Sequence, residues 1–433
     1  MKITLIRPNM TAMRSSDVMQ PLVFSILAGL TPPEIKTVFY DERLESIPFH
    51  DPTDLVAMTV ETYTARRAYE MADRFRKQGV PVVMGGYHPT FLPEEALEHA
   101  DSVVIGDAEG VWEQIIQDAQ EGKLKRMYRH DGKSMLKGLK FDRSIFEGKR
   151  YPYVYPVQYG RGCRYACDFC SIHAFYGTHL RQRPVSEVIE EIGSLRSKHI
   201  FIVDDNIFVD IPKAQELFAA LVPLKISWSC QVSLDVAHHP RLLQLMEKSG
   251  CTVAIVGFES LDERNLTQMK KRWNLKDGDY ATSIQKLKDH GIMIYGTFVI
   301  GYDYDDKDTL NRNVDFALRS NFYLANFNPL TPMPGAALYR RLLEEGRLLY
   351  DRWWLDPNYR YGRATFYPKK MTPDELTEGC FRARSQFNKY SSIFKRAMDF
   401  STNCRSFNCL GLYLASNFIS RREIFRKQGI QLG

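Results

Sequence analysis

The segment RGCRYACDFCSIHAF, residues 161–175, places three cysteines within eight positions of a 433-residue chain that has eight cysteines in all. It follows a strand-like run at 157–161 and precedes five further runs of this kind, which alternate with helical segments. Such alternation is typical of parallel strands covered by helices. We therefore expect the cysteine segment to follow the first strand of such a sheet, at the edge where the carboxyl ends of the strands meet.

The later strand-like runs define the domain that contains this segment. They lie at 199–205, 226–232, 252–258, 292–301 and 323–330. Six strand–helix units are too few for a closed eight-stranded barrel, so we predict a partial (β/α)6 barrel over residues 156–342. A helix is expected at 186–197, with Ser186 as its N-cap.

The residues before the barrel have a pattern of their own. Apolar runs at 2–8, 36–42, 54–60, 80–86 and 101–107 alternate with helical segments. This pattern predicts a doubly wound, Rossmann-like parallel sheet of about five strands over residues 1–121, which would bind a ligand at its carboxyl edge. Residues 122–155 are expected to form a connector, and 343–433 a mostly helical, basic region. The predicted fold class is therefore α/β.

The composition indicates a globular protein of the cytoplasm. Hydrophobic residues make up 44% and charged residues 25% of the chain, which is ordinary for a globular protein. No apolar run approaches the roughly 20 residues of a membrane span, and the first residues, MKITLIRP, lack the features of a signal peptide. We therefore expect the cysteines to be reduced thiols rather than disulfides.

The spacing of Cys163, Cys167 and Cys170, C-x3-C-x2-C, limits the chemistry of the segment. A structural zinc site uses four ligands; His173 or His179 could supply the fourth, so zinc remains an alternative. A disulfide does not fit three thiols. An iron–sulfur cubane held by three thiolates keeps one iron without a protein ligand, open to a substrate or cofactor.

These cysteines, with Phe169 before the last of them, resemble the signature of the radical S-adenosylmethionine (SAM) enzymes. The segments IVDDNIF (202–208), VGFES (256–260), FVIGYDYD (298–305) and TPMPGAALY (331–339) resemble strand-end segments of that family. The resemblance implies a 4Fe-4S cluster on the three cysteines, whose open iron chelates SAM and cleaves it to a 5′-deoxyadenosyl radical. It also implies SAM contacts from Phe169, Asp204, Gly257, Glu259 and Gly301.

The two carboxylates among these residues lie at predicted strand ends, where they could accept hydrogen bonds from the ammonium group or ribose of SAM. For the neighbouring Asp205 and Asn206, capping of the following helix is the favoured interpretation.

The N-terminal region resembles the cobalamin-binding domain of the cobalamin-dependent radical SAM subgroup. The resemblance rests on MQPLVFSILAGL (19–30), GGYHPT (85–90) and VVIGDAEG (103–110), although Ala108 and Asp107 stand where the family usually has glycine and glutamate. The Asp-x-His-x-x-Gly element that supplies a histidine to cobalt does not occur, which implies a cobalt without that ligand. The residues expected to contact cobalamin are Gly85, Gly86, His88, Thr90 and Gly106.

The resemblance implies a radical SAM methyltransferase that uses two SAM molecules to methylate an unactivated carbon. The alternatives are cyclisation or rearrangement with the same cofactors, and a non-enzymatic iron–sulfur sensor or scaffold. An electron donor such as flavodoxin or ferredoxin is expected, and a nucleic-acid partner is not. Methylthiolation of transfer RNA would require an N-terminal cysteine set, and no cysteine precedes Cys163.

The end of the chain is strongly basic. Residues 381–433 contain ten Lys or Arg and two acidic residues. Apolar residues also recur there at helical spacing, namely Phe407, Leu410, Leu414, Phe418 and Phe425. Basic amphipathic helices lie in lipid interfaces, so we expect peripheral contact with the inner membrane surface and an apolar, lipid-like or polycyclic substrate. The alternative is that this stripe packs against the barrel or a second subunit.

Overall fold

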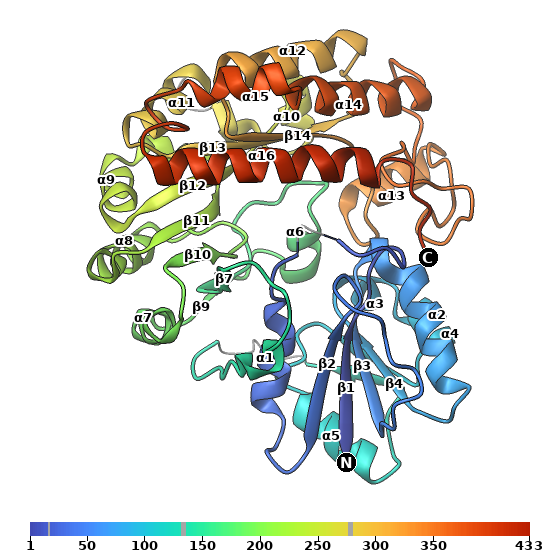
Figure 1. Cartoon of the computed structure of the whole chain (residues 1–433). Coiled ribbons are helices and arrows are strands. Elements are labelled where there is room, and N and C mark those ends of the chain that lie inside the picture. Colours follow the sequence, from blue (N-terminus) through green and yellow to red (C-terminus); the bar gives the residue numbers. More distant parts are fainter. Residues whose placement is uncertain (16–17, 131–135, 276–279) are drawn as a thin grey trace.

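The computed structural model describes residues 1–15, 18–130, 136–275 and 280–433, and shows two α/β domains with a helical C-terminal region (Figure 1). The N-terminal sheet has six parallel strands in the order β2-β1-β3-β4-β5-β6. Its strands are β1 (Lys2–Arg7), β2 (Lys36–Asp41), β3 (Leu55–Thr59), β4 (Val82–Gly85), β5 (Ser102–Ile105) and β6 (Met127–Arg129).

Helices cover both faces of this sheet. They are α1 (Leu22–Leu30), α2 (Ala65–Arg76), α3 (Tyr87–Phe91), α4 (Pro93–His99) and α5 (Trp112–Gln120), with a 3-10 turn η1 (Thr62–Thr64). Successive residues of a strand point to opposite faces. Accordingly, Met58 of β3 packs in the cluster that contains Tyr69 of α2, whereas Ala57 packs in the cluster that contains Trp112 of α5. The doubly wound prediction is confirmed.

The sixth strand, β6, lies inside the segment expected to be only a connector. Its sequence, MYR, has a single buried residue, Tyr128, whose hydroxyl donates to Asp118 at 2.6 Å. Such a short edge strand has no alternating apolar pattern, so sequence periodicity cannot reveal it. A 3-10 turn, η2 (Arg143–Phe146), follows before the second domain.

The second sheet also has six parallel strands, in the order β14-β13-β12-β11-β10-β7, which confirms the partial barrel. Its strands are β7 (Val154–Val157), β10 (His199–Ile202), β11 (Ser227–Val232), β12 (Cys251–Glu259), β13 (Met293–Ile300) and β14 (Leu324–Pro329). A short antiparallel pair, β8 (Gly160–Arg161) and β9 (Arg181–Gln182), flanks the cysteine segment.

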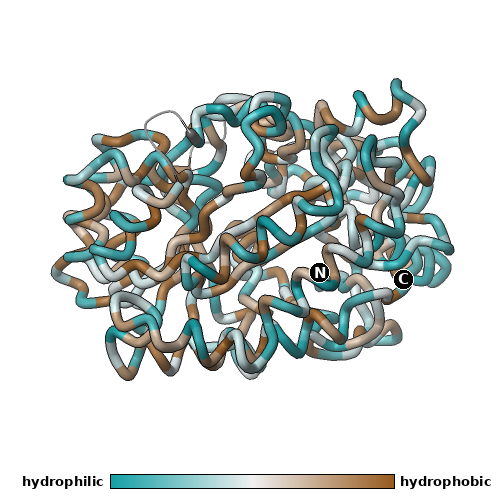
Figure 2. Tube along the Cα trace, turned by 90° about the horizontal axis from the view of Figure 1, so that it is seen from above, coloured by the Kyte–Doolittle hydropathy of each residue, from teal (hydrophilic) through white to brown (hydrophobic). Residues whose placement is uncertain are grey.

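Helices cover the outer face of the barrel sheet, and hydrophobic and hydrophilic residues alternate along them (Figure 2). They include α7 (Val185–Ser194), α8 (Ile211–Leu221), α9 (Pro240–Ser249), α11 (Tyr280–Asp289) and α12 (Lys307–Arg319). The short α6 (Ser171–Tyr176) instead lies between the domains, next to α3, and α10 (Glu263–Gln268) and α13 (Ala337–Glu344) follow β12 and β14 (Figure 1). The 3-10 turns are η3 (Val222–Leu224), η4 (Leu234–His238) and η5 (Arg272–Leu275).

Two expected helix caps are wrong. Helix α7 begins at Val185 and its N-cap is Pro184 rather than Ser186. Helix α8 is capped by Asp210, whose carboxylate accepts the N–H of Lys213. It follows that neither Asp205 nor Asn206 caps the helix after β10.

The C-terminal region packs against the barrel through α14 (Pro373–Phe387), α15 (Tyr390–Ala397) and α16 (Phe407–Lys427). The inward face of α16 carries Cys409, Tyr413 and Asn417. Asn417 accepts a hydrogen bond at 3.1 Å from the buried guanidinium of Arg396. Among the described residues, no helix combines the length and apolar character that crossing a bilayer requires.

The predicted apolar stripe of α16 is partly buried against the barrel and partly exposed to solvent. Leu410 and Leu414 pack against a buried cluster between α16 and the barrel, whereas Phe407, Phe418 and Phe425 are exposed. The polar Asn417 takes an inward position because Arg396 and the Tyr323 carbonyl supply its hydrogen-bond partners. Hydrophobic spacing by itself does not reveal such partners.

Candidate functional site

The cysteine segment forms a loop between β8 and α6 that is fixed at both ends. Gly162 has a φ of +92°, and a Cβ there would lie 2.1 Å from the carbonyl oxygen of His179, so this position requires glycine. Its N–H donates to Asp205 Oδ2 at 2.8 Å. Further along the loop, Asp168 Oδ1 accepts the hydroxyl of Tyr302 at 2.6 Å. The loop is thus tied to the ends of two strands, β10 and β13.

Cys163, Cys167 and Cys170, the motif cysteines, are free thiols with partly exposed side chains. Electrostatic interactions link their pKa values, so the three thiols lie near one another. Burial raises the pKa of Cys167 to about 12, and the charge of Lys271 opposes this shift. The free thiols are therefore protonated at neutral pH, and binding of iron would displace their protons.

The three motif cysteines are candidate ligands of a cluster or of a single ion. In the part of the chain that the structure describes, no group of three or more His, Cys, Asp or Glu side chains is placed to hold one metal ion. In a cubane each thiolate binds a different iron, so the three ligands need not converge on one point. Three thiolates are the donor set of a cubane with one open iron, so the residue types present fit the cluster.

Glu259 and Lys271 form a buried ion pair beside the motif cysteines. The Lys271 Nζ lies 2.8 Å from Glu259 Oε1, and both side chains are buried. Burial lowers the pKa of Lys271, but the negative charge of Glu259 and its hydrogen bond to Lys271 oppose this effect, and the pKa is raised. Lys271 was not identified from the sequence, where it lies in the polar run MKKRWN.

The backbone around Glu259 is adapted to this pair. Glu259 has a φ of +62°, a conformation that non-glycine residues adopt mainly at functional sites. The register of β12 with β13 shifts between Gly257 and Glu259. A Cβ on Gly257 would lie 2.2 Å from Glu259 Oε1 and 2.7 Å from Lys271 Nζ. Gly257 therefore makes room for the ion pair, whereas the resemblance implied a contact with SAM itself.

Asp204 is occupied by the protein backbone. Its carboxylate accepts the N–H of Tyr159 at 2.8 Å, and burial raises its pKa to about 7 against the hydrogen bonds from Gly160 and Tyr159. Asp204 thus holds the segment before the cysteine loop, and Asp205 holds Gly162 within it. Both residues lie at the strand end expected from the sequence. The resemblance implied a SAM contact for Asp204, and Asp205 was expected to cap the following helix, whereas both accept backbone N–H groups.

The remaining predicted SAM contacts lie around the end of β13. The ring of Phe169 meets that of Tyr302 edge to face at 6.4 Å. Gly301 has a φ of +121°, and a Cβ there would lie 2.9 Å from both Phe366 and Leu376 of the C-terminal region. The space above Gly301 is thus filled by Phe366 and Leu376, and the SAM contact that the resemblance implies for Gly301 stays a prediction.

A cavity of about 290 Å³ lies where the two domains meet. The carboxyl ends of β3, β4 and β5 form one side of it, and Gln158, Arg161, Phe175 and Tyr176 form the other. Gly85, Gly86 and Gly106 all line it. At Gly86, φ is +104° and a Cβ would lie 2.9 Å from the Val60 carbonyl oxygen. The glycines at these strand ends thus keep the edge open to a ligand.

Two of the predicted cobalamin contacts are not among the residues that line this cavity. His88 is completely buried, and its Nε2 lies 2.9 Å from Glu95 Oε1 and 3.0 Å from the Tyr69 hydroxyl. Thr90 accepts the N–H of Gly106 through its hydroxyl at 3.1 Å and so joins the loops after β4 and β5. Both residues support the site rather than face it.

Arg161 closes the junction between the domains. Its guanidinium lies 3.1 Å from Asp107 Oδ1 and 2.5 Å from Glu109 Oε1 of the N-terminal domain. Arg181 pairs with Asp107 at 2.6 Å. The cavity lies at the lower limit of volumes that enclose drug-sized ligands.

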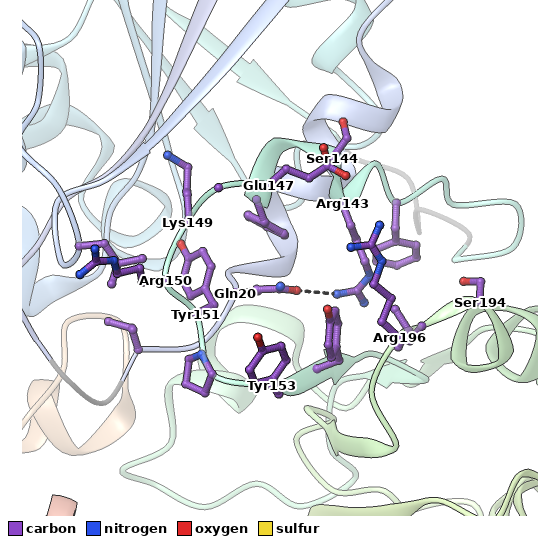
Figure 3. Close-up of a pocket in the computed structure, with 18 of the residues that line it drawn as sticks. Gln20, Arg143, Ser144, Glu147, Lys149, Arg150, Tyr151, Tyr153, Ser194 and Arg196 are labelled. Carbon is purple, nitrogen blue, oxygen red and sulfur yellow. Dashed lines mark hydrogen bonds between the residues drawn. The ribbon is translucent and has the colours of Figure 1, made fainter.

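A larger cleft, of about 1220 Å³, opens along the connector (Figure 3). Tyr151, Tyr153 and Arg196 are among its lining residues, and Arg143 donates to Gln20 at 3.2 Å across it. Arg143 also pairs with Glu191 at 2.6 Å. This cleft lies by the start of β7, whereas the motif cysteines follow the end of that strand. We regard it as part of the link between the domains.

A third cavity, of about 450 Å³, lies between α16 and the last two strands of the barrel. Tyr295, Leu324, Asn326 and Asn328 line it from β13 and β14. Their neighbour Phe327 points the opposite way, toward Phe387 of the outer helices, so this inner cavity borders the concave face of the sheet. From α16, it is lined by Ser416, Ile419, Ser420, Glu423, Ile424 and Lys427.

Two family models match the two domains. Residues 157–312 match the radical SAM superfamily, and residues 29–116 match the B12 binding domain. The chain is also 30% identical over 396 residues to the bacteriochlorophyllide d C-12(1)-methyltransferase of Chlorobaculum tepidum, covering 88% of this chain and 85% of that protein. The chain belongs to the cobalamin-dependent radical SAM enzymes. Its cofactors are accordingly a 4Fe-4S cluster, SAM and cobalamin.

Other relatives of this radical SAM enzyme include a second methylase and a cyclase. The hopanoid C-2 methylase of Rhodopseudomonas palustris is 23% identical, covering 77% of this chain and 66% of that protein. The anaerobic magnesium-protoporphyrin IX monomethyl ester cyclase of Rubrivivax gelatinosus is 24% identical, covering 76% and 63%.

Solved structures share the fold of both domains. OxsB, a cobalamin-dependent SAM radical enzyme, superposes with a TM-score of 0.68 at 14% identity, covering 97% of this chain and 72% of that chain. The methyltransferase TsrM from Kitasatospora setae gives a TM-score of 0.63 at 15% identity, covering 87% and 81%. The order of a Rossmann-like domain followed by a partial barrel is thus a known arrangement.

Proposed function

We propose that this radical SAM enzyme transfers a methyl group to a carbon atom of an apolar, lipid-like or polycyclic substrate. The observation that carries the proposal is the 30% identity, over most of both chains, with a methyltransferase that acts on bacteriochlorophyllide d. When bound, the cofactors supply both the radical and the methyl group. The protein contributes binding, orientation and exclusion of water.

The motif cysteines are the proposed ligands of the cluster, and the Glu259–Lys271 pair is the proposed partner of SAM. The methionine part of SAM carries an ammonium group and a carboxylate. A buried carboxylate and a buried ammonium group, 2.8 Å apart, offer the complementary charges. Because the two protein groups neutralise each other in the absence of SAM, neither is buried as an uncompensated charge.

The proposed cobalamin site is the cavity between the domains, with Gly85, Gly86 and Gly106 at the strand ends. No histidine is found among the described residues that line this cavity, and His88 is engaged by Glu95 and Tyr69. Cobalt bound there is therefore expected to have no histidine ligand. Electron paramagnetic resonance of cob(II)alamin bound to protein whose histidines carry a heavy nitrogen isotope tests this: axial nitrogen splitting that changes with the label would contradict it.

The inner cavity between α16 and the barrel is the proposed chamber for the substrate. Its lining combines apolar groups such as Leu324 and Ile424 with polar ones such as Asn326, whose amide donates to the Tyr295 hydroxyl at 2.6 Å. An apolar body with a few polar groups matches this lining. A flavodoxin or ferredoxin as electron donor, and a location in the cytoplasm or at the inner membrane surface, complete the proposal.

The test is an anaerobic reaction with SAM carrying a deuterated methyl group, the reconstituted enzyme and an apolar extract of the host. A substrate-dependent product that contains the deuterated methyl group is expected, and a Cys167→Ala variant should form none. A product without the label would favour cyclisation or rearrangement instead. Reduced, reconstituted enzyme that cleaves no SAM would favour the sensor or scaffold interpretation.

A further inference from the structure

The outward surface of α15, α16 and the segment between them exposes an unusual number of large apolar side chains. Tyr390, Phe394, Met398 and Phe400 are between 56% and 67% exposed, and Phe407 is 94% exposed. On α16, Phe418, Ile419 and Phe425 are between 39% and 47% exposed. Folded monomers rarely expose contiguous apolar patches of this kind unless the patch binds something.

These side chains share one surface. Helices α15 and α16 pack side by side on one side of the molecule (Figure 1), and the rings of Tyr390 and Phe418 lie 6.2 Å apart across the junction of the two helices. A groove of about 650 Å³ follows this junction, lined by Tyr390, Phe418, Ile419, Arg421, Arg422 and Phe425. We call this surface, residues 390–426, the aromatic face.

The exposed charged side chains of the aromatic face are all positive. Asp399 and Glu423 are the only acidic residues over 390–427, all of which the structure describes, and both are buried. Asp399 pairs with Lys288 at 2.6 Å, and Glu423 pairs with Lys427 at 3.4 Å. Lys395, Arg422 and Arg426 are exposed cations, and the two arginines also lie 3.9 Å and 3.5 Å from Glu423. Three cations of α16, with Lys427, thus share this one carboxylate. Arg421 lies over the rings of both Tyr390 and Phe425, at 4.4 Å and 5.1 Å from their centroids.

We propose that the aromatic face docks this enzyme on an anionic lipid surface. Aromatic and apolar side chains insert at the boundary between headgroups and acyl chains, while Lys and Arg contact the acidic headgroups. A second copy of the chain is a poorer occupant, because a symmetric dimer through this face would oppose cations with cations and provide no exposed carboxylates to neutralise them. Because its exposed aromatic side chains lie on one side, α16 would lie along the membrane plane.

Flotation of the full-length protein with vesicles tests this proposal without any need for catalysis. Binding to phosphatidylcholine vesicles that contain phosphatidylglycerol is expected at low salt, and weaker binding to phosphatidylcholine alone. Replacing Phe394, Phe400 and Phe407 together with serine should abolish flotation. The variant Lys395→Gln/Arg422→Gln should bind the anionic vesicles roughly 25-fold more weakly, since each charge near such a surface contributes about five-fold.

The controls make the same chemical changes elsewhere on the surface. Tyr153→Ser/Leu343→Ser removes exposed apolar groups, and Lys123→Gln/Arg272→Gln removes exposed cations. Both variants should float like the wild type. Wild-type protein that stays away from anionic vesicles, or variants of the aromatic face that float normally, would overturn the proposal. So would a dimer in sedimentation equilibrium that the triple serine variant dissociates, because the face would then be a subunit interface.

Discussion

Replacing Lys271 with methionine is expected to destabilise the barrel domain by about 3–5 kcal/mol, because the Glu259 carboxylate then lacks its partner in a buried position. The 2.8 Å separation corresponds to an attraction of about 6 kcal/mol at an effective dielectric constant of about 20. Since the desolvation of the lysine, which offsets part of this attraction, disappears in the variant, the net loss is smaller. It corresponds to a fall of roughly 6–20 °C in melting temperature for a domain of this size.

Thermal unfolding of the wild type, Lys271→Met, Glu259→Gln and the double variant under anaerobic conditions measures this loss. The double variant has no unpaired buried charge, so it should be more stable than Lys271→Met. Binding of SAM, measured by equilibrium dialysis, should be lost in all three variants. If the losses in stability of the two single variants simply add in the double variant, the two charges are not coupled and the reasoning is refuted.

Three further results are expected. Alanine at any motif cysteine should remove the cluster, and iron analysis of the wild type should give about four irons per chain; eight would indicate a second cluster. Gly86→Ala should bind cobalamin more weakly and unfold at a lower temperature, because φ at this position is +104° and the new Cβ would lie 2.9 Å from the Val60 carbonyl oxygen. Gly193→Ala in α7 serves as the control, since a Cβ there meets nothing within 4 Å. Asp204→Asn should gain stability relative to the wild type as pH rises from about 4 to 7. Burial raises the pKa of Asp204 to about 7, so the folded wild type keeps over this range a proton that the unfolded chain releases, and the wild type loses stability. A difference between the two proteins that does not change with pH would contradict this.

The sequence predicted the features that depend on local pattern. Both parallel sheets follow from runs of apolar residues separated by helices, and the cysteine spacing C-x3-C-x2-C points to the proposed cluster ligands. Gly86 of GGYHPT falls just after β4 because the turn needs a positive φ there and a Cβ would lie too close to the Val60 carbonyl oxygen.

Features that depend on partners distant in sequence could not be predicted. Lys271 follows another lysine, and nothing in the local pattern tells which of the two is buried against Glu259. His88 follows the end of a strand, where a ligand contact is expected, but its imidazole is buried and hydrogen-bonds with Glu95 and Tyr69. Asn417 lies on the inward face of α16 because the buried Arg396 donates a hydrogen bond to it.

Ile419 lines both the groove of the aromatic face and the inner cavity, so a single helix lies between the proposed lipid surface and the proposed reaction chamber. A substrate dissolved in the bilayer would then reach the enzyme by lateral diffusion in two dimensions. The concentration that the enzyme encounters is then the mole fraction of the substrate among the lipids, which does not depend on the volume of the surrounding water. Adding inert vesicle lipid at constant total substrate should therefore slow turnover by surface dilution, whereas adding buffer to a fixed amount of vesicles should not.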